Sequence, residues 1–512
     1  MRIKNIISSI ENYHLINCVI FIFVWIFLRI FFEGVLEVFH TIGFSKLSYR
    51  AILMYFVHFP LFYLTSYLLI TILISIIIRK DIIKVTKITS LGLGLIIFVP
   101  VIDAFICGGC FITYPSRLEK YFLHFLNPSV SLIDIGVSIG QRIVILGICF
   151  LVSIYGYLKT GKILKTIFLF FAILLTILFM GSITTMLAGN QPERVFISGG
   201  ILNTDTQKFS AIYSIIFIIA IFIYFYLVDK KNFRLFISSL RIERMAFYGF
   251  LGIAGFVLAQ HRAGIIHRLD FFNLLAILLI FLSPGIGFCA LQILNDFFDV
   301  QADAVSKPRN PLVSSIWKKY YIVIGSSLAL IVLMFSAILN YQAFLIMLSF
   351  FLLGILYSVP PVRLKRLPLI STFVLAFAVV LSIGLGFSGV YYEKALNQIP
   401  LPLFYALLFG VTLGFTAKDI NDTDADKKDG IITLPVLLYK NDTVMGRLPL
   451  GLIISSGYIF FAIFIPEVLL GSLIASVITF IYTLLTTRPR EWFYFLILYF
   501  FAFYLLATLR LP

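Results

Sequence analysis

The chain has 512 residues, of which 61% are hydrophobic and 12% charged, and its mean hydropathy is +1.05. A water-soluble fold cannot bury so large an apolar fraction, so the composition excludes a soluble protein and indicates an integral membrane protein. The formal net charge of +16 could suggest nucleic-acid binding. However, the basic residues lie in short loops between apolar runs, so we expect them to face the surface of a lipid bilayer, with no nucleic acid as partner.

Apolar runs of about 20 residues, the length that crosses a bilayer, recur along the whole chain. Six precede a basic segment at residues 229–244 and nine follow it. We therefore predict an all-α polytopic membrane bundle of two parts, a six-span module of unknown function at residues 1–238 and a nine-span domain at residues 239–512. The predicted spans are residues 15–32, 51–78, 91–106, 142–157, 166–186, 210–228, 245–260, 271–294, 320–339, 343–357, 369–391, 401–417, 450–464, 469–485 and 492–509.

Lys and Arg residues are concentrated in alternate loops, which the positive-inside rule assigns to the cytoplasm. Lys84 and Lys87 are assigned to the loop after the second span. This pattern predicts a multi-pass cell-membrane protein with a cytoplasmic N-terminus and, after an odd number of spans, an external C-terminus. Two isolated charges, Arg29 and Asp103, fall near span ends, where we expect snorkelling or interfacial exposure. A buried functional charge is the alternative.

Two of the five cysteines lie close together, in the sequence CGGC at Cys107–Cys110 near the predicted outer end of the third span. An external CxxC pair can form a disulfide or a redox couple. Two ordinary apolar cysteines are the alternative, and the sequence leaves both interpretations open.

The first polar motif follows the apolar run 271–294 and reads NDFFDVQAD. Asn295, Asp299 and Asp303 are spaced four residues apart, so on a continuing helix they share one face. The carboxylates of Asp296, Asp299 and Asp303 repel one another unless a cation lies between them. A set of oxygen ligands without His or Cys suits Mg²⁺. Lys307 and Arg309 follow, as expected where a metal-bound diphosphate needs further positive charge. A polar loop that merely caps a membrane helix is the alternative.

A basic motif, YSVPPVRLKR, lies between the tenth and eleventh predicted spans. Pro360 and Pro361 stop the helix, and we expect them to hold the segment extended. Arg363, Lys365 and Arg366 then place three cations at the membrane surface, with the Tyr357 hydroxyl nearby.

The second acidic motif, KDINDTDADKKDGIITLPV, begins at Lys418 as the twelfth predicted span ends. Asp419, Asp422 and Asp426 are spaced three and four residues apart, again on one helical face. Two acidic motifs on the same side of a helical bundle can hold two divalent ions on one diphosphate.

These motifs resemble the UbiA superfamily of intramembrane prenyltransferases. The family pattern NDxxDxxxD is matched by Asn295–Asp303, and its second motif is matched by KDIND with Asp422 and Asp426, followed by GIITLPV. The YSxPPxRLKR segment is similar to a loop of chlorophyll-synthase-like and archaeal ether-lipid members. The resemblance covers residues 244–512, and the first six predicted spans lie outside it.

The resemblance implies a transferase that moves a polyprenyl group from its diphosphate to an aromatic or lipid-like hydrophobic acceptor in or at the membrane. It implies two Mg²⁺ ions held by Asp299, Asp303, Asp422 and Asp426, with Asn295 as a further oxygen ligand or orienting group. Residues expected on the substrate side are Asn295, Asp296, Lys307, Arg309, Tyr357, Arg363, Lys365, Lys418 and Asp419. Of these, Asp296 and Asp419 are candidates for a supporting or general-base role.

Two alternative functions remain at this point. A family member that transfers a sugar phosphate to a polyprenyl phosphate, as a phosphoribosyltransferase, would use the same acidic motifs on a different diphosphate. A membrane transporter would use the acids as an ion path, but transporters usually place them near the bilayer midplane within repeated halves. Here the acids lie at predicted cytoplasmic span ends, which favours the transferase.

Overall fold

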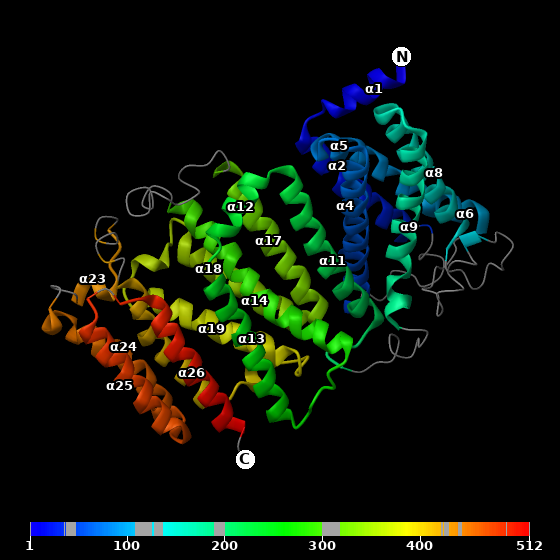
Figure 1. Ribbon diagram of the computed structural model, residues 1–512. Helices are drawn as coiled ribbons and strands as arrows, with labels where there is room; N and C mark the ends of the chain where they lie inside the picture. Colours follow the sequence, from blue (N-terminus) through cyan, green and yellow to red (C-terminus); the bar gives the residue numbers. More distant parts are fainter. Residues whose placement is uncertain are drawn as a thin grey trace. The chain divides into compact units, whose positions relative to one another are not determined.

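The computed structural model describes residues 2–34, 36, 48–107, 125–126, 137–188, 200–299, 318–420, 423, 427, 430–438, 443–487 and 489–510. Every regular element in these ranges is a helix (Figure 1). Fifteen helices of the described part are long and apolar enough to cross a membrane. The prediction of an all-α bundle with fifteen spans is therefore confirmed. The chain divides into two compact units, Met1–Arg234 and Leu235–Pro512.

Unit 1 contains six candidate spans, two of which combine several helical segments. Its helices are α1 (Arg2–Glu11), α2 (Leu15–Glu33), α3 (Tyr49–Leu53), the π-helix η2 (Met54–His58), α4 (Phe59–Ile78), α5 (Ile82–Gly92), the 3₁₀-helix η3 (Leu93–Ile97), α6 (Phe98–Cys107), α8 (Ile139–Thr160), α9 (Ile163–Ala188) and α11 (Asp205–Val228). A short helix, α12 (Lys230–Ser239), carries the chain from unit 1 into unit 2.

The predicted start of the third span is wrong, because Lys84 and Lys87 lie on helix α5 and not in a loop. Asp81 caps this helix, and its side chain accepts a hydrogen bond from the Ile83 N–H at 2.9 Å. The long lysine stems allow such residues to sit on the first turns of a span while their ammonium groups reach polar partners. Lys87, for example, donates to the backbone oxygen of Glu11 at 2.9 Å.

The expectation that Arg29 and Asp103 are exposed near span ends is also wrong. Both side chains are buried. Arg29 forms an ion pair with Glu33 at 2.9 Å, and the Asp103 carboxylate accepts hydrogen bonds from the Ser138 hydroxyl at 2.6 Å and the Gly140 N–H at 2.8 Å. Internal partners replace water for both charges, which makes burial tolerable.

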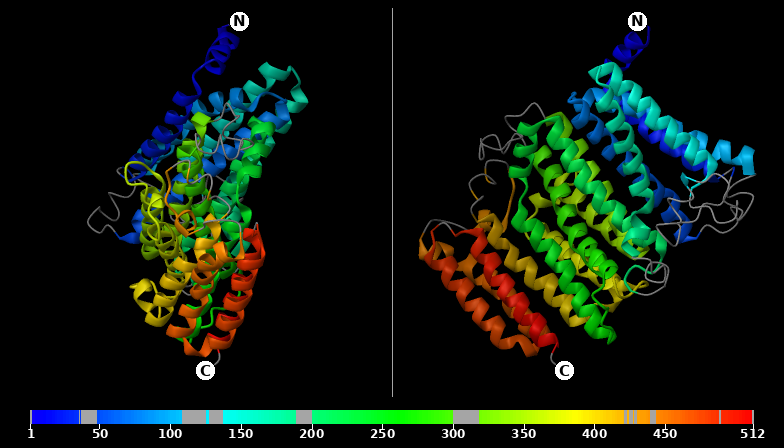
Figure 2. Two further views of the ribbon diagram at one scale, coloured as in Figure 1. Left: turned by 90° about the vertical axis from the view of Figure 1, so that its left-hand side faces the viewer. Right: turned by 45° about the vertical axis from the view of Figure 1, so that its right-hand side comes forward.

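Unit 2 contains the remaining nine candidate spans, whose helices run side by side (Figure 2). Its elements are α13 (Ile242–Ala263), α14 (Phe271–Phe298), α17 (Lys318–Leu339), α18 (Tyr341–Ser358), η4 (Leu364–Arg366), α19 (Ile370–Ser388), η5 (Ala395–Gln398), α20 (Leu401–Tyr405), the π-helix η6 (Ala406–Gly410), α21 (Val411–Gly414), η7 (Phe415–Asp419), α23 (Leu434–Leu438), α24 (Val444–Phe464), η8 (Pro466–Val468), α25 (Leu469–Leu485) and α26 (Glu491–Arg510). The elements η4, η5, η7 and η8 are 3₁₀-helices.

Glycines allow helices α13 and α19 to pack backbone against backbone in the middle of unit 2. A Cβ atom added at Gly255 would overlap the carbonyl group of Ile383, and one added at Gly386 would overlap the backbone of α13. Helix α19 is the most deeply buried of the fifteen candidate spans. Such small-residue contacts are common between membrane helices. Because lipid tails are as apolar as the helix surfaces, the hydrophobic effect does not drive helices together, and close van der Waals packing takes its place.

Candidate active site

The first acidic motif lies at the end of helix α14. The helix ends at Phe298, and Asp299 is its C-terminal cap, with its N–H donating to the Asn295 carbonyl at 3.0 Å. The Asn295 amide also donates to the Asp299 carboxylate at 2.8 Å. The structure thus places Asn295 and Asp299 on one face, as their spacing predicts. Asp303, the third residue of this motif, lies outside the described residues.

The basic motif forms a turn after helix α18. The Arg363 N–H donates to the Val359 carbonyl at 3.1 Å, and a short 3₁₀-helix, Leu364–Arg366, follows. The expectation that Pro360 and Pro361 hold an extended segment is therefore wrong, because this hydrogen bond closes the loop on itself. Arg363 has a left-handed backbone (φ 43°) at the bend. The turn directs Arg363 and Lys365 toward helix α14.

These two cations meet Asp299, so that residues far apart in sequence form one cluster. Arg363 Nη2 lies 2.5 Å from Asp299 Oδ1, and Lys365 Nζ contacts Asp299 Oδ2. Lys365 also donates to the Asn295 amide oxygen at 3.0 Å, and the Ser358 hydroxyl donates to the same oxygen at 3.1 Å. We call Asn295, Asp299, Arg363 and Lys365 the Asp299 cluster.

Burial affects the charge of the Asp299 cluster. It lowers the pKa of the Lys365 ammonium below its ordinary value, while the charge of Asp299 and its hydrogen bond to Lys365 oppose that lowering. The nearby charges of Arg363 and Lys418 lower this pKa further. The two cations of the cluster and the nearby Lys418 thus lie close enough to repel one another, and a bound anion would relieve that repulsion.

The second acidic motif begins at the end of an irregular span. From Leu401 to Asp419 the chain passes through α20, the π-helix η6, α21 and the 3₁₀-helix η7. This differs from a plain α-helical span, and π-helical turns are frequent at functional sites. At the end of the span, Lys418 Nζ lies 2.9 Å from the Asp419 carboxylate and donates to the Tyr357 hydroxyl at 3.1 Å.

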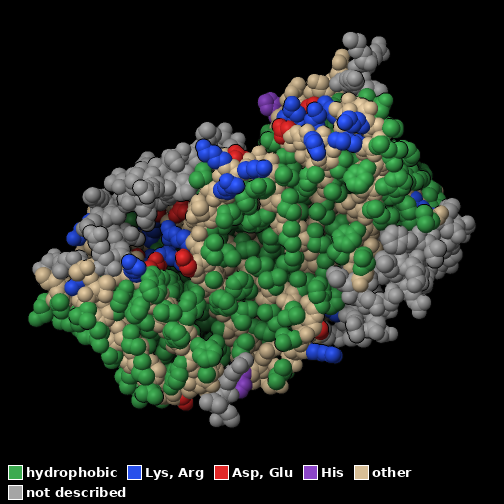
Figure 3. Space-filling view, in the orientation of Figure 1, with side chains coloured by type: hydrophobic (Ala, Val, Ile, Leu, Met, Phe, Trp, Pro, Cys, Tyr) green, Lys and Arg blue, Asp and Glu red, His purple; other side chains and the backbone are tan. Residues whose placement is uncertain are grey.

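The two motifs line one cavity of about 250 Å³ in unit 2. In Figure 3, Lys, Arg, Asp and Glu side chains gather in a hollow in a face that is otherwise largely hydrophobic. Much of the remaining cavity lining is aromatic or aliphatic, which gives an apolar space next to the charged groups. The aromatic side chains of the lining are Phe247, Tyr248, Phe288, Phe350, Tyr357, Phe415 and Phe495.

Sequence reasoning missed the contribution of helix α13 to this cavity. Arg241 and Arg244 belong to the basic segment 229–244, which the charge pattern assigns to a cytoplasmic loop, yet both line the cavity. Arg241 Nη2 lies 3.8 Å from the carboxylate of Asp296, and the Gln292 side chain donates to the same carboxylate at 3.4 Å. The sequence does indicate the contact between Gln292 and Asp296, because residues four apart on a helix face each other.

Glu491 at the start of helix α26 was also missed. Its carboxylate lies 2.5 Å from Arg244 Nη2, so the ion pair joins the first turns of helices α13 and α26 at the cavity wall. Nothing in the local sequence around Glu491 indicates this contact, because its partner lies 247 residues earlier in the chain.

The charges of the described cavity lining balance. Four cationic residues, Arg241, Arg244, Lys365 and Lys418, each lie opposite one of four acids. The pairs are Arg241–Asp296, Arg244–Glu491, Lys365–Asp299 and Lys418–Asp419. Arg363, which contacts Asp299 from beside the lining, adds one further positive charge. A strongly anionic ligand such as a diphosphate would still need more positive charge from another source.

Several predicted site residues lie outside the described part of the chain. They are Asp303, Lys307, Arg309, Asp422 and Asp426. Cys110 also lies outside it, whereas Cys107 ends helix α6. The predicted site residues that the structure does bring together in or beside the cavity are Asn295, Asp296, Asp299, Tyr357, Arg363, Lys365, Lys418 and Asp419.

Comparison with known proteins gives similarities to prenyl-transferring enzymes. A digeranylgeranylglyceryl phosphate synthase of Thermococcus sibiricus is 30% identical over 207 residues, which are 40% of this chain and 68% of that enzyme. The Sulfolobus acidocaldarius synthase of the same name is 28% identical over 32% of this chain and 58% of its own length. The chloroplastic 2-acyl-4-prenylphloroglucinol 6-prenyltransferase of Humulus lupulus is 27% identical, over 30% and 39% of the two chains.

Solved structures of UbiA homologues are also similar. One from Archaeoglobus fulgidus, bound to DMAPP and Mg²⁺, is 19% identical with a TM-score of 0.36, covering 53% of this chain and 98% of that one. An apo homologue from Aeropyrum pernix K1 is 16% identical with a TM-score of 0.40, covering 52% and 98%.

The profile of the UbiA prenyltransferase family matches residues 248–511, which begin within helix α13 and extend to the end of α26. This range contains both acidic motifs and the basic motif. The chain therefore belongs to the UbiA prenyltransferase family.

Proposed function

We propose that this membrane prenyltransferase moves a polyprenyl group from its diphosphate to a hydrophobic acceptor in a Mg²⁺-dependent reaction. The observation that carries the proposal is a charged cluster beside an apolar cavity within one unit. A prenyl diphosphate has the same two parts, a compact anionic head and an apolar tail. The diphosphate head could therefore bind at the charged cluster while the prenyl tail occupies the adjoining apolar space.

The charge balance of the lining supports the requirement for a metal. A diphosphate adds several negative charges, whereas each described cation of the lining already faces an acid. Further positive charge is needed to bind the diphosphate and to stabilise it as it leaves. The available donors are carboxylate and amide oxygens, which suit Mg²⁺.

We propose Asp299, Asp303, Asp422 and Asp426 as the ligands of two Mg²⁺ ions. When bound, the ions would neutralise charge on the diphosphate and make it a better leaving group. Asn295 lies beside Asp299 as a further ligand or as an orienting group. Its contacts favour orientation, because its amide holds Asp299 while its oxygen accepts from Lys365 and Ser358.

Arg363 and Lys365 are the proposed partners of the diphosphate oxygens. Both already contact Asp299 from the same turn, so little reorganisation is needed before they meet an anion. A diphosphate bound beside Asp299 would compete for these same cations. Lys307, Arg309 and Lys418 are proposed to take further negative charge, with Tyr357 holding the Lys418 ammonium in place.

The rest of the cavity would shelter the reacting carbon. Departure of the diphosphate leaves an allylic cation, which water would capture in a wet site. Phe247, Phe288, Phe350 and Phe415 line the space and exclude water, and aromatic faces also stabilise nearby cations. Asp296 and Asp419 are proposed to accept the proton that the acceptor releases.

The relatives' names guide the choice of acceptor. The relatives from Thermococcus sibiricus and Sulfolobus acidocaldarius are both named digeranylgeranylglyceryl phosphate synthases, and the Humulus lupulus relative is named a 2-acyl-4-prenylphloroglucinol 6-prenyltransferase. We propose a lipid-like glyceryl phosphate acceptor first and an aromatic acceptor second.

The test is a transfer assay with the purified full-length protein in lipid nanodiscs. Prenyl diphosphates of five to twenty carbons would be combined with Mg²⁺ and either a prenylglyceryl phosphate or a phenolic acceptor. Diphosphate release and prenylated products, measured by mass spectrometry, are expected with at least one pair and are expected to stop with chelator. No diphosphate release from any donor would overturn the proposal.

We also propose how the protein lies in the membrane. The alternate basic loops support a cytoplasmic N-terminus, cytoplasmic active-site loops and an external C-terminus. Unit 1 is proposed to be a separate module, since the family match begins only at residue 248. Cysteine labelling from either side of the membrane would test this orientation.

A further inference from the structure

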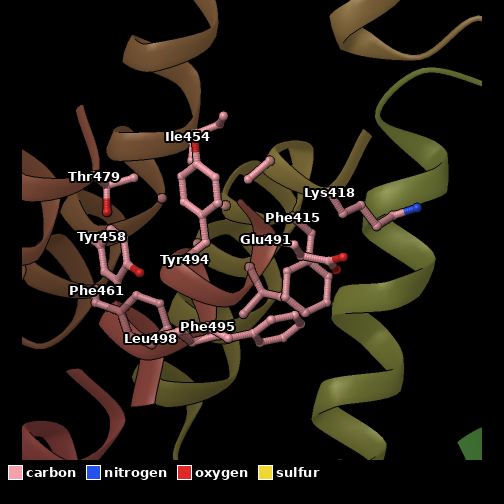
Figure 4. A pocket seen from close by; sticks show the side chains of 15 residues that line it. Phe415, Lys418, Ile454, Tyr458, Phe461, Thr479, Glu491, Tyr494, Phe495 and Leu498 are labelled. Atoms are coloured by element: carbon pink, nitrogen blue, oxygen red, sulfur yellow. The ribbon is translucent and has the colours of Figure 1, made fainter. Parts of the chain in front are cut away.

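A second, apolar pocket adjoins the active-site cavity. Its volume is about 60 Å³, and it lies among the span Leu401–Asp419 and helices α24, α25 and α26 (Figure 4). Phe415, Lys418, Glu491 and Phe495 line both the pocket and the cavity. The two spaces therefore meet at these four side chains.

The charged groups of this pocket lie at one end. Along the span Leu401–Asp419, the pocket lining includes Gly410, Gly414 and Lys418, and Lys418 also lines the active-site cavity. On helix α26 the lining begins with Glu491 and continues to Leu498. Figure 4 shows the Lys418 amino group pointing away from the aromatic rings of the pocket. The pocket thus leads from a charged entrance into an apolar interior.

The interior is formed by buried side chains that neighbouring helices hold in place. Tyr458 and Phe461 both pack edge-on against Phe501, with ring centroids 5.2 and 5.0 Å apart. The Tyr494 hydroxyl lies 2.9 Å from the Thr483 hydroxyl, so this tyrosine has a polar partner. Such packing gives the pocket a fixed shape.

Glycines create the space, and their roles differ. A Cβ atom at Gly457 would lie 2.5 Å from the carbonyl oxygen of Gly410, so these two glycines allow close helix packing. A Cβ atom at Gly414 would have no heavy atom within 4 Å, apart from its own local backbone. Gly414 has an ordinary helical backbone, with φ −61° and ψ −37°. A side chain at position 414 would therefore extend into open space without backbone strain.

We propose that this pocket binds a prenyl unit of the donor beyond the one that reacts, and that Gly414 determines which donor chains fit. The inference rests on the proposed function. Three observations select the donor tail as occupant: the interior is apolar, its charged entrance adjoins the proposed diphosphate site, and the size is suitable. A volume of about 60 Å³ is more than one water molecule requires, so a short apolar group can enter the pocket.

A larger residue at position 414 would compete with the tail and not with the diphosphate. Because lipid surrounds the protein, a displaced donor tail still lies in an apolar environment. The affinity of the protein for the donor therefore need not fall much. The main effect is on position, since moving the tail shifts the carbon that reacts. A displacement of about 1 Å can slow a reaction roughly a hundredfold.

The test compares donors of different length with full-length Gly414→Leu, Gly414→Ala and wild-type protein in nanodiscs with Mg²⁺. The measured quantity is kcat/KM for the twenty-carbon donor divided by kcat/KM for the five-carbon donor. We expect Gly414→Leu to lower this ratio by about tenfold or more, with Gly414→Ala intermediate. Gly147→Leu is the matched control, because a Cβ atom at Gly147 on helix α8 also has no neighbour within 4 Å.

Three results with an active wild-type protein would overturn the inference. An unchanged ratio in a folded Gly414→Leu protein would mean that the tail lies elsewhere. A change in only the KM of the acceptor would mean that the acceptor occupies the pocket. An equal fall in the ratio for Gly147→Leu would show that the effect does not come from this pocket.

A cross-linking experiment separates this inference from the proposed function. The probe is an uncleavable prenyl bisphosphonate with a diazirine in its second prenyl unit, added to full-length wild-type protein. We expect labelled peptides from residues 410–418 and 454–461, found by mass spectrometry, whether or not the protein completes transfer. Labelling confined to other helices would overturn the inference even if the transfer assay succeeds.

Discussion

Replacing Lys365 by Met should impair the enzyme because it removes a cation that contacts Asp299 within the cavity. The Lys365 side chain is only 9% exposed and contacts both Asp299 and Asn295. Met keeps the length and apolar stem of the side chain but cannot donate to an anion. Arg366 is an exposed cation in the same turn that does not line the cavity, so Arg366→Met is a matched control for loss of loop charge.

The expected magnitude follows from the number of contacts that are lost. Removal of one preorganised donor to a developing negative charge typically lowers turnover by about 10²–10³-fold, or about 2.7–4 kcal/mol. The effect on folding should be smaller, because Asp299 retains Arg363 as its partner at 2.5 Å. We expect Lys365→Met to lower the unfolding free energy by about 1–3 kcal/mol.

The assay measures initial rates of diphosphate release in nanodiscs at saturating Mg²⁺, with thermal unfolding measured in parallel. Lys365→Met should lose turnover while remaining folded, and Arg366→Met should stay close to wild type. A Lys365→Met enzyme within threefold of wild type would refute the role that we assign to this lysine. So would an equal loss in Arg366→Met, since that would point to loop charge in general.

Three further predictions follow from other contacts. Tyr357→Phe should lower kcat/KM for the donor about two- to tenfold, because Lys418 loses one hydrogen bond but keeps Asp419; unchanged donor kinetics would contradict this. Gly386→Leu should lower the free energy of unfolding by about 1–3 kcal/mol, because the new side chain would overlap helix α13, and Gly147→Leu is the control. Equal melting temperatures of the two variants would contradict the close packing of helices α13 and α19. A shortened protein starting near Ser239 should insert and retain Mg²⁺-dependent diphosphate release; a folded but inert product would place unit 1 within the active bundle.

The spans could be predicted because hydropathy depends on local sequence alone. All fifteen predicted spans have a counterpart, and the errors lie at their ends. The third span begins at Ile82 because Asp81 caps the helix and lysines are tolerated on its first turns. Hydropathy places such lysines in a loop, whereas the cap and the snorkelling side chains extend the helix past them.

The candidate site was predictable only where its contacts follow from spacing or from a recognised motif. The four-residue interval between Asn295 and Asp299 leads directly to their hydrogen bond. By contrast, Arg244 meets Glu491 only because helix α13 packs near the start of α26, 247 residues later. Local sequence contains no information on that approach. The turn at Arg363 was missed for a similar reason, because its closing hydrogen bond to Val359 is a property of the folded loop.

The central claim is that the two acidic motifs act together to bind the metal that activates a prenyl diphosphate. The most direct measurement is Mg²⁺-dependent diphosphate release by full-length wild-type, Asp299→Asn and Asp422→Asn proteins, each titrated with Mg²⁺. Wild type should release diphosphate only with Mg²⁺, and each variant should lose roughly a hundredfold or more in turnover at saturating metal. Wild-type release that persists unchanged in chelator, or full activity in either folded variant, would contradict the claim.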